Sequence, residues 1–109
     1  MKDMLPVQVQ REWVLKETHA NPIEQAPALA RQQGVARWET ALYRAKDEIA
    51  VQVFDMKAEA NAFEMMQKWN KSEGPAFFKG QYFFVANSTV VPRQNLLEFV
   101  QDLQANLKP

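Results

Sequence analysis

The fold is decided by one stretch of the sequence, EIAVQVFDMKAEANAFEMMQKW, residues 48–69. Its first half alternates with a period of two residues, which places Ile49, Val51 and Val53 on one face of a strand. After Asp55 the period becomes that of a helix, whose apolar side is formed by Ala58, Ala62, Met66 and Trp69, with Phe63 beside them. This order predicts a strand that runs directly into an amphipathic helix. The helix is expected to fold back onto the sheet to bury its apolar side.

The segments around this stretch complete a sheet and its helical cover. Alternation predicts a strand over 7–17, followed by a turn over 18–22. A short helix is expected from Pro27 to just before Gly34. A strand over 36–46 and a short polar loop lead into the strand at 48–55. Residues 76–78 and 81–86, joined by Lys79-Gly80, form a second hairpin. A last helix opens at Pro92, with an apolar stripe formed by Leu96, Val100, Leu103 and Leu107.

The resulting order, β-α-ββ-α-ββ-α, predicts an α+β fold. Strands joined by short loops are antiparallel, so we expect an antiparallel sheet of about five strands. Two amphipathic helices with one apolar stripe each are expected to cover one face of that sheet, which makes a two-layer sandwich. With 109 residues and no linker or repeat in the sequence, the chain is expected to be a single domain over 1–109.

Composition excludes several classes of function. Thirteen basic and thirteen acidic side chains cancel, so no basic face is expected for nucleic-acid binding. There is no cysteine, which excludes disulfides, thiolate catalysis and cysteine-based metal sites. The N-terminal residues have no apolar run, and no membrane insertion is expected. The compartment is left open: extracytoplasmic if a signal peptide has been removed, in which case Met1 need not be native, and cytoplasmic otherwise.

Part of the chain resembles a family of uncharacterised, mostly exported bacterial domains known only as a domain of unknown function. The resemblance spans about 34–86 and is carried by ALYR at 41–44, IAVQVFDM at 49–56, Ala62-Phe63, and FKGQYF at 78–83. The sequence departs from the family at Lys57-Ala58, where family members have small residues or an acidic cap. The resemblance implies an α+β fold and an extracytoplasmic setting. It brings no catalytic residues.

No motif indicates an enzyme, and we expect no catalytic residue, no metal site and no cofactor. His19 is the only histidine, and with Glu17 it supplies too few ligands for a zinc site, so a surface role is expected. Asp55 lies at the junction between strand and helix, where capping of free backbone N–H groups is the favoured role over catalysis.

The aromatic residues are the feature that favours a function. If helices cover only one face of the sheet, rings on the other face form an exposed patch, which often marks an interaction surface. The candidate residues are Trp38, Tyr43, Phe54, Phe77, Tyr82 and Phe84. Through this face, or through an edge strand, the chain would form a homodimer or bind a protein partner. An alternative is a binder of a small apolar or aromatic ligand in a cleft lined by Trp38, Phe54, Met65 and Tyr82. A structural alternative is that the N-terminal strand and short helix cover the same face.

Overall fold

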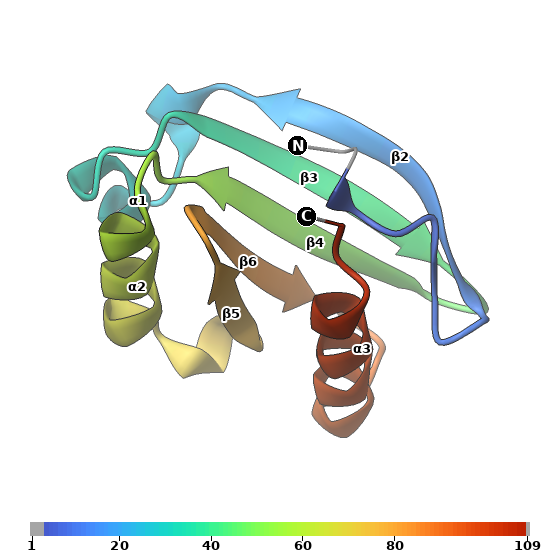
Figure 1. Ribbon diagram of the computed structural model, residues 1–109. Helices are drawn as coiled ribbons and strands as arrows, with labels where there is room; N and C mark the ends of the chain where they lie inside the picture. The colour runs from blue at the N-terminus through green and yellow to red at the C-terminus, as the bar shows by residue number, and fades with distance from the viewer. Residues whose placement is uncertain (1–3, 109) are drawn as a thin grey trace.

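A computed structural model describes residues 4–108 of the chain. Over that range the sequence forms one antiparallel sheet and helices on both sides of it (Figure 1). The strands are β1 (Gln8–Val9), β2 (Trp13–Asn21), β3 (Arg37–Arg44), β4 (Glu48–Asp55), β5 (Ala76–Lys79) and β6 (Tyr82–Asn87). The helices are α1 (Ala28–Gln32), α2 (Glu59–Lys68) and α3 (Arg93–Ala105), with single 3-10 turns η2 (Ile23–Gln25) and η3 (Lys71–Glu73). The α+β class is confirmed.

The sheet is strongly curled and runs in the order β1-β2-β3-β4-β6-β5, with six described strands where about five were expected (Figure 1). The extra strand comes from the segment predicted as one strand over 7–17. Gln10 and Arg11 both adopt positive φ angles, 54° and 66°, so the chain reverses and Val9 pairs with Trp13. The turn expected over 18–22 is also wrong, because β2 continues to Asn21, which pairs with Trp38.

The central hairpin of β3 and β4 forms where it was predicted, with a short loop between the two strands. Arg44 pairs with Glu48 next to the loop, and Arg37 pairs with Asp55 at the other end. The short helix also begins after Pro27 as expected. These segments were predictable because their turn residues and apolar alternation agree with one another.

The two long helices pack against opposite faces of the sheet, which contradicts the predicted two-layer sandwich. Residues 49, 51 and 53 of β4 share a buried cluster with Phe99 and Leu103 of α3. Phe54, which points the other way, shares a second cluster with Ala62 and Met65 of α2 and Ala30 of α1. We call these sides the α3 face and the α2 face. In Figure 1, β5 and β6 lie between α2 and α3.

Both faces are covered because β6 is apolar on both. Phe84 is buried on the α3 face and Phe83 on the α2 face, and each is at most 1% exposed. A strand that is apolar at successive positions requires a cover on each side. The prediction of one covered face failed because the apolar stripe of a helix does not indicate which face of the sheet the helix will cover.

Candidate functional site

A cleft on the α2 face is the strongest candidate site. It has a volume of about 360 Å³ and opens between β3, β4 and β6 on one side and the two segments 25–27 and 69–73 on the other. We call it the Trp38 cleft. Its lining residues are Gln25, Pro27, Trp38, Gln52, Phe54, Trp69, Glu73, Val85 and Asn87.

Trp38 is positioned by its neighbour in the sheet. It pairs directly with Phe54 of β4, and the two rings are nearly parallel, with an interplanar angle of 4° and centroids 5.9 Å apart. The indole N–H of Trp38 donates to the side-chain carbonyl of Gln52. Phe54 is buried, whereas Trp38 is half-buried. The Trp38 ring therefore lines the cleft in a fixed orientation.

Trp69 forms the opposite wall. It follows the last residue of α2 in an extended conformation, and its ring packs edge-on against Phe83 with centroids 5.3 Å apart. Its indole N–H is buried and has no hydrogen-bond partner among the described residues. Buried donors without a protein partner are uncommon, and an ordered water commonly satisfies them.

A second hollow continues the cleft toward the other end of β4. Its volume is about 510 Å³, and it shares Glu73 and Asn87 with the Trp38 cleft. The side-chain amide of Asn87 donates to the backbone carbonyl of Glu73, which ties β6 to η3 at the junction. Beyond it, the Ser88 hydroxyl donates to the carbonyl of Glu48 and accepts from the N–H of Val91. The two hollows together form an elongated surface along the end of β6.

The predicted interface residues do not form one surface. Tyr43, Phe54, Phe77 and Phe84 are buried, while Trp38 and Tyr82 are half-buried. Only Trp38 and Phe54 line the Trp38 cleft. Of the cleft predicted from Trp38, Phe54, Met65 and Tyr82, the first two lie together, Met65 is buried behind them, and Tyr82 belongs to the other face. Trp69, Gln52 and Asn87 were missed as lining residues, because no local motif marks residues that converge from three elements.

Asp55 and His19 each contact other side chains or backbone groups of the chain. Asp55 is 6% exposed, and its carboxylate accepts from the N–H of Lys57 and from the side-chain amide of Gln81. It therefore holds the turn between β4 and α2. The expected helix cap is wrong, because α2 begins at Glu59, its N-cap residue is Ala58, and no side chain caps it. His19 lies on β2, not in a turn, with Nε2 3.2 Å from Glu17 Oε1.

The described residues contain no group of three or more histidine, aspartate or glutamate side chains placed to hold a metal ion. Within 4–108, no helix is long and apolar enough to cross a membrane. Comparison with known proteins finds no match to this chain among family models, curated proteins or solved structures. The resemblance to the family of uncharacterised bacterial domains therefore stays a prediction.

Proposed function

We propose that this chain is a non-catalytic binding domain that holds a small ligand with a flat apolar or aromatic group in the Trp38 cleft. The observation that carries the proposal is the half-buried Trp38 ring, which is backed by Phe54 and faces a wall that contains Trp69. Small-molecule sites are concave and mostly apolar, with a few polar groups that fix orientation. The Trp38 cleft has this composition.

The polar lining residues indicate the chemistry of the ligand. Three of them, Gln25, Gln52 and Asn87, carry amides, which donate and accept hydrogen bonds. Glu73 is the only charged residue in the lining of the Trp38 cleft. A carboxylate repels anions, so the cleft favours a neutral or cationic ligand over an anionic one.

Binding is tested with a panel of neutral, cationic and anionic aromatic compounds. Ligands that bind only the folded chain raise its melting temperature. We expect stabilisation by neutral or cationic members of the panel, with amide NMR shifts at Gln52, Val85 and Asn87. If no compound stabilises the chain, or if the shifts fall on the α3 face, the proposal is wrong.

Trp38→Ala tests whether the ligand binds in the Trp38 cleft or elsewhere on the surface. We expect it to weaken ligand binding at least about tenfold, because an aromatic anchor of a pocket typically supplies more than about 1.4 kcal/mol. Phe63→Ala is the matched control, since it removes a ring that is 44% exposed on α2 and does not line the cleft. Equal affinities of the two variants, measured by calorimetry, would place the ligand elsewhere.

Association through an aromatic sheet face, which the sequence favoured, stays a weaker proposal. Four of the six predicted rings are buried. The other two, Trp38 and Tyr82, lie on opposite sides of the sheet. A partner that bound by stacking would therefore meet one exposed ring at a time. A protein partner has a better surface at the edge of the sheet.

A further inference from the structure

Among residues 4–108, no strand covers the edge of the sheet along most of β2. Strand β1 pairs only with Trp13 and Val14, and the N–H of Leu15 donates to the carbonyl of Val7. Beyond Leu15, no described strand lies beside residues 16–21 on this side. An edge strand presents a row of N–H and C=O groups that can pair with another strand. Residues 16–21 contain no proline to prevent such pairing.

We propose that a second copy of this chain pairs with this edge, antiparallel, so that two sheets join across a twofold axis at Thr18. The proposal does not depend on the Trp38 cleft. The choice of Thr18 as the centre follows from the alignments of two β2 strands that this edge permits. A twofold axis between antiparallel strands places one residue opposite its own copy, so the candidate centres within this segment are Glu17, Thr18 and His19.

The neighbouring β1 strand excludes the first register. With Glu17 at the centre, the partner's His19 would lie opposite Leu15, whose N–H is already bonded to Val7 at 2.9 Å. Farther along, the partner's Ala20 would lie opposite Val14, where Gln8 of β1 already sits. The open edge is therefore too short on that side, whereas with Thr18 at the centre only Asn21, the last residue of β2, lies opposite Leu15.

The side chains that face each other across the axis decide between the two remaining registers. With His19 at the centre, the two histidines face each other and Glu17 faces the uncharged Asn21. With Thr18 at the centre, Glu17 faces the partner's His19, and the same pair forms again on the other side of the axis. An imidazole N–H donates a hydrogen bond to a carboxylate directly across a ladder, and polar pairs of this kind stabilise it, whereas the His19-centred register leaves Glu17 without such a donor from the partner's imidazole.

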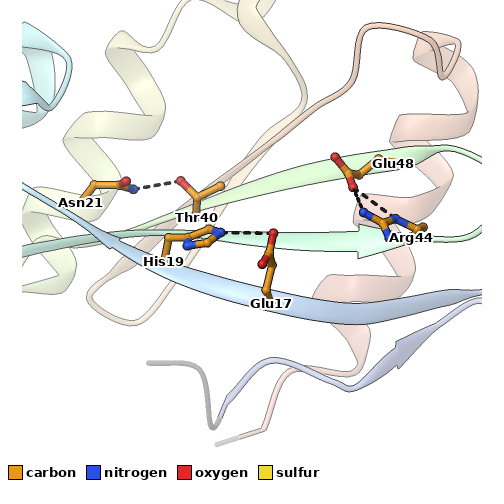
Figure 2. A network of polar contacts seen from close by, with 6 residues as sticks. All are labelled: Glu17, His19, Asn21, Thr40, Arg44 and Glu48. Atoms are coloured by element: carbon orange, nitrogen blue, oxygen red, sulfur yellow. Dashed lines mark hydrogen bonds and ion pairs between the residues drawn. The ribbon is translucent and has the colours of Figure 1, made fainter.

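The side chains are already placed for this second arrangement. Glu17 and His19 lie on the same face of β2, and Figure 2 shows the imidazole beside the carboxylate. Their side chains are 52% and 55% exposed, so both are accessible to a partner. In the dimer, Glu17 and His19 of the two copies form a ring in which carboxylates and imidazoles alternate. The two Thr18 side chains meet on the opposite face of the joined sheet. Threonine pairs across antiparallel strands are also favourable.

The dimer is expected to be weak. About five residues pair on each strand, so the buried area falls at the low end for specific interfaces, below about 1,200 Å². Self-association should therefore appear only at high concentrations, up to about 1 mM.

A cysteine scan tests the register directly, because the chain has no cysteine of its own. Thr18→Cys places the two sulfurs opposite each other on the axis, so mild oxidation should yield a disulfide-linked dimer. In His19→Cys and Ala20→Cys the two Cα atoms are expected to be about 8 Å and about 14 Å apart, too far for a disulfide. Non-reducing electrophoresis measures the yield, with urea-unfolded protein as the control for random collision.

Faster cross-linking at Thr18 than at the other two positions supports the proposal. Equal rates at all three positions, or the fastest rate at His19, would overturn it.

A charge exchange tests the same contact without cysteine. Glu17→Lys and His19→Glu should each weaken self-association, measured by sedimentation. The first removes the acceptor that faces the partner's His19, and the second places two carboxylates opposite each other. The double variant places opposite charges across the ladder and should restore association. Glu98→Lys, an equal change at an exposed position on α3, is the matched control. A wild-type chain that stays monomeric at about 1 mM, or a double variant without recovery, would contradict the proposal.

Discussion

At Tyr43, burial and a single hydrogen bond decide the chemistry of the side chain. The ring is fully buried, and its hydroxyl donates to the carbonyl of Pro6 at 2.7 Å. Phe99 of α3 meets the ring edge-on, with centroids 5.4 Å apart. Burial raises the pKa of the Tyr43 phenol well above its usual value. Tyr43 is therefore a neutral core residue and an anchor for the N-terminal segment.

This pKa shift predicts a loss of stability at alkaline pH. Above about pH 10 the phenol ionises in the unfolded chain but keeps its proton in the folded chain, so the folded state binds more protons. The free energy of unfolding should then fall with rising pH, by up to about 1.4 kcal/mol per pH unit from this group. Urea unfolding between about pH 8 and about pH 11 measures the slope. Tyr43→Phe should flatten it, and an unchanged slope in this variant would contradict the assignment.

At the scale of elements, the connection from α2 to β5 shapes both hollows. It leaves α2 at Trp69, passes through η3 and reaches β5 across the end of β6, where the N–H of Ala86 donates to the carbonyl of Pro75. Gly74 lies within this connection with a φ of 135°. A Cβ at Gly74 would lie 2.3 Å from the carbonyl oxygen of Ala86. The close crossing of the two backbones therefore requires glycine.

Gly74→Ala should consequently destabilise the fold more than Gly80→Ala. Both positions have positive φ, so both variants carry backbone strain of about 1–3 kcal/mol. Only Gly74 adds a clash with backbone, since a Cβ at Gly80 meets nothing within 4 Å. We expect Gly74→Ala to cost at least about 1 kcal/mol more in urea unfolding. Equal losses would show that the crossing can relax.

For the whole molecule, the two buried clusters define its organisation. α3 and the N-terminal segment cover one face, α1 and α2 cover the other, and the central strands contribute side chains to both. Phe99 contacts the rings of Trp13 and Tyr43, whereas Met65 belongs to the cluster with Phe54 and Phe83. The two helices therefore stabilise the same sheet through separate sets of contacts.

This separation predicts additive effects of mutation. Met65→Val and Phe99→Leu should each lower the free energy of unfolding by about 1–2 kcal/mol, and the double variant should lose their sum within about 0.5 kcal/mol. Trp13→Phe with Phe99→Leu is the contrasting pair, because these rings touch and should show coupling. Strong coupling between positions 65 and 99 would contradict a core divided by the sheet.

Local chemistry made much of the fold predictable. The turns at Pro27, at the loop after Arg44 and at Pro92 were located correctly, because each carries residues that favour the observed backbone. The reversal of the chain at Gln10 and Arg11 was not predicted, because neither residue is typical of a turn with positive φ. Of the candidate site, only Trp38 and Phe54 were found in advance, as neighbours within one predicted hairpin.

By itself, the sequence determined the class of the protein: an α+β chain with the β3–β4 and β5–β6 hairpins, each strand or helix marked by its own apolar period. Only the tertiary structure decided which face each helix covers and which residues meet in the Trp38 cleft. The physical reason is that an apolar stripe indicates that a surface is buried, but does not indicate which other surface it packs against. The partner of each stripe is chosen by packing among residues far apart in the chain, once the sheet has curled.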